Sequence, residues 1–473
     1  MSAQESKMTR RDFLRLSAAV GGASLLAACA PKPTPAPAQE PTKEAPAAAT
    51  SAPTAPPAPK EPAKIRIMSR GGDYIAEVFD KQIEAFTKIH PEIQIEQEQS
   101  TGAHHEKLLL EFAAGTAPDT YFDANRTTGL LVKKGVALDL EPFLEVEPGH
   151  NEDDFYSKAW IAQTYENKRW GLGWDSGGMA VAFDIEIFER AGLDLPDHAK
   201  PVTWNELVEL AKQLTLDFND KHPGEAGFDP TRIKQYGYKP DTGHAFFSFV
   251  YENGGEVSDS DGSVPIDSPE AIEAVQWVAD LGLVHFCAPS PAYEQSTTMD
   301  MRSKNVAMQD TGVWMLGRLN DAGVKWGTMP FAMNKVQVTY GHYSPLSVCT
   351  QSKYKQQAFT WIYWACCSKE GEKMLLDLGM QQPMRKDLTE EFLSSPNPPE
   401  RKYRENFVTA FDDKTFRYPG DKIGSYFGSY RQPWIDLWGP YLDRVFAGNA
   451  RFEEVAAELR EKTEYLLKTG EVT

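Results

Sequence analysis

Cysteine is scarce in this chain, which contains five in 473 residues. No two of them form a CxxC pair, and their spacing matches neither a zinc site nor a disulfide framework. A fold that depends on disulfides or on structural zinc is therefore excluded. Four of the five are expected to be core thiols, with one disulfide of undetermined pairing as the alternative. These four are Cys287, Cys349, Cys366 and Cys367.

Positively charged residues are also fewer than negatively charged ones. The chain has 49 Lys and Arg residues against 68 Asp and Glu residues, which gives a formal net charge of −19 at pH 7. Nucleic acids and anionic lipid surfaces both need a basic face on the protein that binds them. We therefore expect no nucleic-acid partner. An acidic balance suits solubility and neutral or cationic ligands.

Long apolar runs are missing beyond residue 63, where none approaches the roughly 18 residues of a transmembrane helix. The apolar stretch 16–28 is only about half a membrane span. It follows Arg10-Arg11-Asp12-Phe13-Leu14, which resembles a twin-arginine export signal. The residues Leu26-Ala27-Ala28-Cys29 resemble a bacterial lipobox, in which the cysteine thiol carries the lipid.

We therefore expect residues 1–28 to be a lipoprotein signal and Cys29 to be the lipidated first residue of the exported chain. A lipid anchor would hold the protein at the outer face of the cell membrane, and it would be the chain's sole membrane attachment. The alternative is an ordinary apolar N-terminal helix with a buried cysteine. Residues 29–63 are predicted to be a tether, because Pro and Ala fill 22 of the 34 positions from 30 to 63.

Residue patterns for catalysis and for metal or cofactor binding are sparse. No P-loop is present, and His104-His105-Glu106 lacks the HExxH spacing of a zinc site. Acidic residues always offer carboxylate pairs, but none stands out as the acid and base of a glycosidase. We expect neither a metal nor a cofactor, and we do not expect an enzyme.

The folded part begins with alternating strand and helix patterns. Residues 64–68 alternate as a strand does, and the apolar residues Phe79, Ile83, Phe86 and Ile89 follow at helical spacing. A second strand at 93–95 and a second helix and strand up to residue 123 imply an α/β sheet covered by helices. Ligands bind such sheets beyond the carboxyl ends of the strands. The polar residues there are Asp73, Asp123, Asn125 and Arg126.

The second part of the chain continues the alternation. Thr203-Trp204-Asn205-Glu206 is a capping box, and Ser268-Pro269 is a second helix start. We predict a glycine-rich bend leading into a strand over 171–184, a turn over 310–314, and a loop at 341–344 before a helix over 354–367. No internal repeat is present at solenoid periods.

Several motifs in a fixed order resemble the family 1 extracellular solute-binding proteins of ABC importers, the group that includes the maltose-binding protein. The resemblance covers nearly all of residues 64–473, and no single motif is diagnostic. The motifs are Phe86 to Pro91, Glu106 to Asp123, Gly135 to Leu140, the helix at Thr203, Asn253-Gly254-Gly255, Val306-Ala307-Met308 with Gly312-Val313-Trp314, and the helix from Gln357 to Cys366.

This resemblance implies a two-lobed periplasmic-binding-protein fold of type II, with mixed sheets flanked by helices. Lobe 1 would comprise 64–174 and 331–380, and lobe 2 would comprise 183–327 and 385–473. Three crossings, near 174–183, 328–330 and 382–384, would join the lobes around a ligand cleft. The family captures a solute by hinge closure and delivers it to the permease subunits of an ABC transporter. A monomer is expected.

A sugar ligand needs flat aromatic rings for its C–H faces and polar groups for its hydroxyls. The aromatic candidates are Trp174, Trp314, Trp434 and Trp438, and a core role is the alternative for each. The resemblance implies ligand contacts at Trp314 and at the loop that carries Tyr343. Asp175, at a crossing, joins the four polar strand-end residues, for which a solvated turn is the alternative.

The predicted function is capture of a sugar or oligosaccharide. One alternative keeps the fold and changes the ligand to a polyol, a glycerol phosphodiester, an amine or another small solute. The other alternative is a secreted carbohydrate-active enzyme.

Overall fold

The sheet is assembled on strand β6 (Leu172–Asp184), which pairs with strands from both parts of the chain. The strand order is β2-β1-β3-β11-β6-β9-β8-β7, and β10 also pairs with β6. Residues 172–178 of β6 pair with β11, and residues 179–183 pair with β9. This computed structural model describes residues 62–100, 104–122, 127–243, 246–259, 263–290, 299–412, 417 and 431–469.

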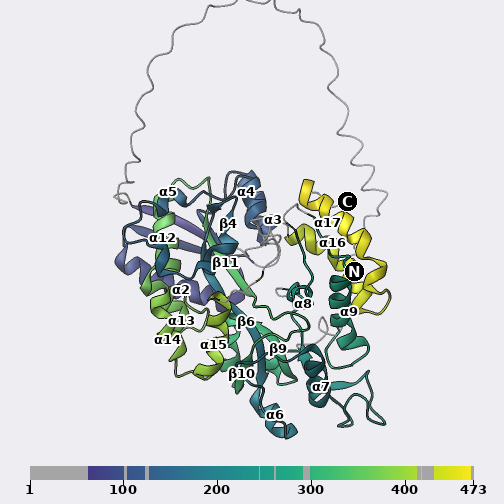
Figure 1. Ribbon diagram of the computed structural model, residues 1–473. Helices are drawn as coiled ribbons and strands as arrows, with labels where there is room; N and C mark the ends of the chain where they lie inside the picture. Colours follow the sequence, from purple (N-terminus) through teal and green to yellow (C-terminus); the bar gives the residue numbers. More distant parts are fainter. Residues whose placement is uncertain are drawn as a thin grey trace, which may run out of the picture. The chain divides into compact units, whose positions relative to one another are not determined.

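The elements on one side of β6 form what we call the first half. Strands β1 and β2 are parallel, β3 is parallel to β1, and β11 is antiparallel to both β3 and β6. Figure 1 shows α12 and α13, which come late in the sequence, beside α2. The first half contains β1 (Ala63–Ser69), α2 (Gly72–Ile89), β2 (Ile93–Gln99), α3 (His104–Ala113), β3 (Thr120–Phe122), α4 (Thr128–Lys133), α5 (Glu141–Leu144), η1 (Glu152–Asp154), η2 (Ser157–Gln163), β4 (Thr164–Tyr165), β5 (Lys168–Arg169), β11 (Gly341–Val348), α12 (Lys355–Cys367) and α13 (Lys369–Asp377).

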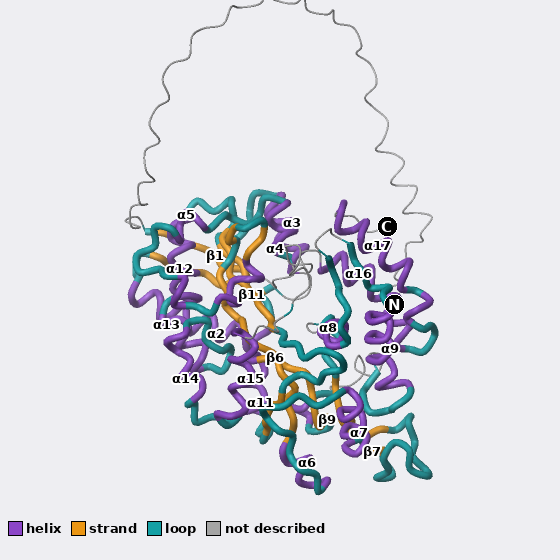
Figure 2. The backbone as a smooth tube through the Cα atoms, viewed as in Figure 1, coloured by secondary structure: helices purple, strands orange, loops and turns teal. Residues whose placement is uncertain are grey.

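The elements on the other side of β6 form the second half. Strands β8 and β9 are parallel, whereas β9 and β10 are both antiparallel to β6. Helices flank the strands in both halves (Figure 2). The second half contains α6 (Ile185–Ala191), α7 (Trp204–Leu214), β7 (Leu216–Asp217), β8 (Ile233–Lys239), α8 (Ser248–Glu252), α9 (Pro269–Leu283), η3 (Met301–Ser303), β9 (Val306–Gly312), η4 (Val313–Met315), α11 (Leu316–Asp321), β10 (Trp326–Met329), η5 (Lys386–Leu388), α14 (Thr389–Leu393), α15 (Arg401–Asp412), α16 (Arg431–Phe446), η8 (Phe452–Glu454) and α17 (Ala456–Thr469).

Each half has hydrophobic cores on both faces of its strands, because successive strand residues point to opposite faces. In the first half, Ile67 belongs to the larger core, here called the first core, whereas the next residue, Met68, belongs to a smaller one. In the second half, Val181 belongs to the second core and Ala182 to the third core. The result is a layered α/β arrangement in both halves, and the predicted two-lobed α/β fold with mixed strands is confirmed.

The predicted lobe boundaries differ from these cores in one segment. Phe331, Ala332, Val338 and Tyr340 pack in the second core, although the prediction assigned 331–380 to lobe 1. The first core receives the chain from Leu346 onward. The chain therefore enters the first half at β11 and not directly after β10.

The sequence signals for helix N-termini predicted correctly where two helices begin. The Thr203 hydroxyl accepts from the Glu206 N–H at 3.2 Å, and the Glu206 carboxylate accepts from the Thr203 N–H at 2.7 Å, so the capping box is confirmed. Ser268 caps α9, with Pro269 at its first position. The prediction for Ile89 is wrong, since this residue is 57% exposed at the end of α2 and lies off the buried face.

Three predicted bends are in fact strands. Residues 171–178 are not a glycine-rich bend, because β6 already begins at Leu172. Asp310 is not in a turn, because β9 continues to Gly312. The predicted loop at 341–344 is the first part of β11, which pairs with β6 from Gly341 to Leu346.

The four cysteines of the folded part are buried free thiols, so the expected core thiols are confirmed. Burial raises the pKa of the Cys287 thiol to about 12.

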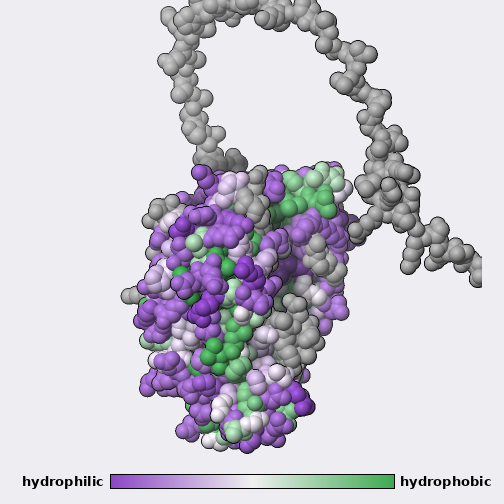
Figure 3. All heavy atoms as spheres, turned by 90° about the vertical axis from the view of Figure 1, so that its right-hand side faces the viewer, coloured by the Kyte–Doolittle hydropathy of each residue, from purple (hydrophilic) through white to green (hydrophobic). Residues whose placement is uncertain are grey.

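Within the described ranges, no helix combines the length and the apolar character needed to cross a membrane. The face in Figure 3 is mostly hydrophilic, with hydrophobic side chains gathered in a few patches.

Candidate functional site

A tight turn places polar groups at the carboxyl end of β1. Gly71 and Gly72 have positive φ angles of 101° and 80°, and the chain passes through them directly into α2. A Cβ on Gly71 would lie only 2.7 Å from Cγ1 of Ile75, so glycine is needed there. Arg70 and Asp73 flank this turn. Asp73 is exposed, and Arg70 is half-buried.

Arg70 reaches from β1 across two neighbouring strands. Its guanidinium carbon lies 4.9 Å from the centre of the Phe122 ring at the end of β3. Its Nη2 donates to the Ser344 hydroxyl of β11 at 3.3 Å. These contacts hold the guanidinium in a defined position at the strand ends, which favours the recognition of hydroxyl or carboxylate oxygens.

The register of β6 and β11 brings Asp175 to the same place. Ser344 is the direct partner of Asp175, and Tyr343 is the partner of Ser176. Asp175 is 9% exposed. Arg70, which lies in the same loop as Asp73, thus bonds to Ser344, and Ser344 pairs with Asp175 and follows Tyr343. The structure brings the Asp73 loop, Asp175 and the backbone of Tyr343 together in this way. Sequence reasoning did not nominate Arg70 or Ser344, although Arg70 directly follows the strand and precedes the glycine pair.

Trp314 approaches this region from the second half. Gly177 lies two residues after Asp175 and therefore on the same face of β6. A Cβ on Gly177 would lie 2.3 Å from Cγ2 of Val313, so the turn that carries Trp314 packs onto this face. Trp314 itself is half-buried and packs against both the second and the third core. It keeps part of its indole surface outside these cores.

The Trp314 ring is folded back over its own strand. A Cβ on Gly312 would lie 2.0 Å from Cζ3 of Trp314, which means that one part of the ring rests on the Gly312 backbone. Gly312 therefore fixes the position of the indole. Such a fixed and partly exposed ring is suited to stacking against the apolar face of a sugar.

Two of the predicted ligand tryptophans are core residues, and these predictions are wrong. Trp174 is fully buried, stacks on Phe79 with the ring centres 4.2 Å apart, and donates from Nε1 to Gln82 Oε1 at 2.6 Å. Trp438 is 1% exposed and donates to the Thr463 hydroxyl at 2.9 Å. Trp174 lies at the register shift between β6 and β11, where Gly173 and Asp175 pair with the adjacent residues Pro345 and Ser344, and its ring packs in the first core.

The other predicted ligand residues lie wholly or partly outside the described residues. Asp123, Asn125 and Arg126 fall between the described ranges, and Cys29, the predicted lipidation site, precedes the first of these ranges. Tyr343 and Trp434 are placed only by their backbone, in β11 and α16. Their roles stay predictions.

The second half contains two buried carboxyl groups that accept hydrogen bonds from the protein, Asp310 in β9 and Glu252 at the end of α8. The Tyr238 hydroxyl donates to Asp310 at 2.7 Å, and the Asp241 N–H donates to its other oxygen at 3.0 Å. Trp204 Nε1 donates to Glu252 at 2.7 Å. Burial raises the pKa of Asp310 to about 7 and that of Glu252 to about 8. Three of their oxygens thus accept from donors of the protein itself.

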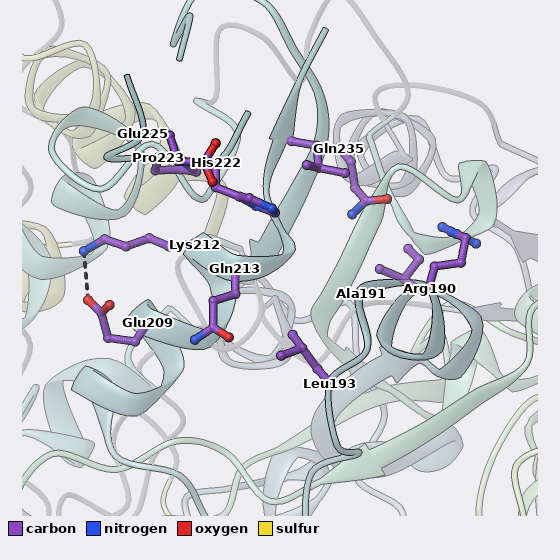
Figure 4. A pocket seen from close by; sticks show the side chains of 12 residues that line it. Arg190, Ala191, Leu193, Glu209, Lys212, Gln213, His222, Pro223, Glu225 and Gln235 are labelled. Atoms are coloured by element: carbon purple, nitrogen blue, oxygen red, sulfur yellow. Dashed lines mark hydrogen bonds and ion pairs between the residues drawn. The ribbon is translucent and has the colours of Figure 1, made fainter. Parts of the chain in front are cut away.

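A pocket lined by described residues lies elsewhere, between α6 and α7 next to β8. It has a volume of about 640 Å³. Figure 4 shows charged and amide side chains around it, with Lys212 paired to Glu209 at 2.8 Å. None of its twelve lining residues is a Trp, Tyr or Phe, so it has no surface for stacking a sugar. Across the described ranges, no group of three or more metal-binding side chains occurs.

Comparisons with known proteins identify the family of the chain and its fold. Residues 71–365 match the model of the bacterial extracellular solute-binding protein family. The chain is 26% identical over 223 residues to an arabinooligosaccharide-binding protein of Halalkalibacterium halodurans, covering 46% of each chain. It is 23% identical to a maltotriose-binding protein of Pyrococcus abyssi, covering 64% of this chain and 62% of that one.

A solved structure is similar in fold. An ABC substrate-binding protein of Listeria monocytogenes, in complex with cycloalternan, superimposes with a TM-score of 0.74 at 21% identity, over 86% of this chain and 99% of that one. The alignments to the two sugar-binding relatives span about half and about three fifths of those proteins.

Proposed function

The chain belongs to the bacterial extracellular solute-binding protein family, and we propose that it captures a sugar or oligosaccharide between its two halves for an ABC transporter. The observation that carries this proposal is that Arg70 bonds to Ser344, the strand partner of Asp175, while Val313, the neighbour of the half-buried Trp314, packs at Gly177 on the same strand. Charged and polar groups there suit sugar hydroxyls, and the indole suits a C–H face.

The ligand would bind without chemical change. The buried carboxyl groups of the second half are bonded to Tyr238 and Trp204, which argues against a role as general acid or base at an open site. Closure of the halves around the sugar would present one shape to the permease subunits. The predicted lobes, with the boundary moved to β11, are the moving parts of this proposal, and the protein would act as a monomer.

The proposed location is outside the cytoplasmic membrane. Export through the segment that begins at Arg10-Arg11, and lipidation of Cys29, would leave the folded part on a Pro- and Ala-rich tether. In cells, Cys29→Ser should move the protein from the membrane fraction to the soluble extracytoplasmic fraction. A Cys29→Ser protein that stays membrane-bound would contradict the anchor.

The binding proposal is tested by calorimetric titration with maltose, maltotriose, arabinotriose, tagatose and glycerol. At least one of the sugars should release or absorb heat with a saturable isotherm, and Arg70→Ala should weaken its binding at least tenfold. Arg190→Ala is the matched control, since Arg190 lines the pocket between α6 and α7. The absence of binding by every sugar, or a loss of binding only in Arg190→Ala, would contradict the proposal.

A further inference from the structure

Besides β6, which pairs with strands of both halves, a further contact joins the two halves next to the candidate site. Tyr74, in the first turn of α2, donates from its hydroxyl to the carbonyl oxygen of Leu378 at 3.0 Å. Gly317, near the start of α11, donates its N–H to the carbonyl oxygen of Gly379 at 3.3 Å. The guanidinium carbon of Arg318 lies 5.5 Å from the centre of the Tyr74 ring. We call Tyr74, Gly317, Arg318, Leu378 and Gly379 the joint.

The joint connects residues that belong to different cores. Tyr74 and Leu378 pack against the first core, which lies in the first half. Leu316, the neighbour of Gly317, belongs to the third core, which lies in the second half. The hydrogen bond from Gly317 to Gly379 and the stacking of Arg318 on Tyr74 therefore cross from one half to the other.

Both glycines are needed for this close approach. A Cβ on Gly317 would lie 2.4 Å from the Tyr74 hydroxyl oxygen and 3.2 Å from the Leu378 carbonyl oxygen. Gly379 has a φ of +69°, and a Cβ there would lie 3.0 Å from the Gly317 nitrogen. Any side chain at position 317 would thus act as a wedge between the halves unless the Tyr74 hydroxyl moved away.

The joint also lies next to both segments of the candidate site, the one that carries Arg70 and the one that carries Trp314. Tyr74 follows Asp73 directly, in the turn that places Arg70. Gly317 follows Trp314 by three residues, and the short η4 connects them. The segment that carries Arg70 is therefore fixed to the segment that carries Trp314 at this contact.

We propose that the contact of Tyr74 with Gly317 and Arg318 positions the two halves for ligand capture. These are positioning residues, which act through the distance between Arg70 and Trp314 and touch no ligand themselves. Small displacements at such a packed junction are amplified into rigid-body rotation, because packed interfaces do not deform continuously. The effect on affinity rests on the proposed function, whereas the effect on the placement of the halves does not.

The placement can be measured without any ligand by electron–electron distance spectroscopy on the full-length chain. Spin labels are attached at Glu84→Cys on α2 and Glu209→Cys on α7, whose side chains are 71% and 67% exposed. Cys29→Ser removes the predicted lipidation, and the four other native cysteines are buried. Gly317→Ala should shift or split the distance distribution, and adding Tyr74→Phe, which removes the obstructing hydroxyl, should restore it.

Gly439→Ala is the matched control, because a Cβ on this glycine would meet nothing within 4 Å. Its distribution should superimpose on that of the parent protein. If Gly317→Ala does not fold, Tyr74→Ala takes its place and should broaden the distribution by removing both the hydrogen bond and the ring under Arg318. A distribution that is unchanged in the folded joint variant would overturn the proposal, whatever the affinity.

Affinity gives the second readout. For the sugar of the panel that binds with the largest heat, Gly317→Ala should change Kd at least threefold, and Gly317→Ala with Tyr74→Phe should return it toward the parent value. A shift in distance with no change in Kd would show that the joint does not control capture and would overturn the proposal. Failure of every sugar to bind the parent chain would count against the proposed function alone, since the distance measurement would still decide the joint.

Discussion

Replacing Trp314 with Ala separates a ligand contact from a core contact. A fully buried tryptophan replaced by alanine costs about 3–5 kcal/mol of stability. Trp314 is half-buried, and part of its ring rests on the Gly312 backbone, so we expect a loss of about 2 kcal/mol in the free energy of unfolding. If the exposed part stacks on a sugar, affinity should also fall by about 1–3 kcal/mol, which is about 5-fold to 150-fold.

A second variant displaces the ring without removing it. Gly312 has a φ of −124° and a ψ of −177°, which alanine adopts freely, so Gly312→Ala strains nothing in the backbone. Its Cβ would overlap Cζ3 of Trp314, at 2.0 Å, and would push the indole aside. We expect Gly312→Ala to lose most of the affinity that Trp314→Ala loses. We expect Trp314→Phe to bind the sugar more tightly than Trp314→Ala but less tightly than the parent chain.

Calorimetric titration with the best sugar of the panel gives the affinity, and urea unfolding gives the stability. Gly439→Ala is again the control, because the added methyl group contacts nothing. If Trp314→Ala and Gly312→Ala both lose stability while their Kd stays equal to that of the parent chain, Trp314 is a core residue and the stacking argument is refuted.

Three further predictions follow from buried groups and caps. Trp174→Ala should cost about 3–5 kcal/mol of stability and leave sugar affinity per folded molecule unchanged, as titration would show. Stability in urea should fall as pH rises from about 5 to 8. Burial raises the pKa of Asp310 to about 7 and those of Glu252 and Glu372 to about 8. Over this pH range the folded state therefore holds protons that the unfolded state releases near pH 4. A flat or rising profile would contradict this sign. Thr203→Ala should lose about 1 kcal/mol in urea unfolding through the capping box, and Thr203→Ser should lose much less.

Features set by local sequence were predictable. The capping box at Thr203 and the Ser268-Pro269 start depend on residues within one turn of each other, and both helices begin where expected. The alternation of strands and helices in residues 63–122 likewise follows from spacing alone. These signals sufficed for the α/β class of the fold.

Features set by distant pairing were not predictable. Gly341 to Ser344 form a strand because β6 offers them hydrogen bonds from residues more than 160 positions away in the chain. The burial of Trp174 in the first core was not predictable either, because the pairing of β6 with β11 changes register next to this residue. Arg70 was missed for the same reason, because its partners Phe122 and Ser344 are remote in sequence.

The most direct test of the central claim is a crystal structure of the chain grown with the sugar that binds most tightly in the titration panel. We expect electron density for the sugar between Arg70, Asp175 and the Trp314 ring, with atoms from both halves in contact with it. Density in the pocket between α6 and α7, or on the surface of one half alone, would contradict capture between the two halves.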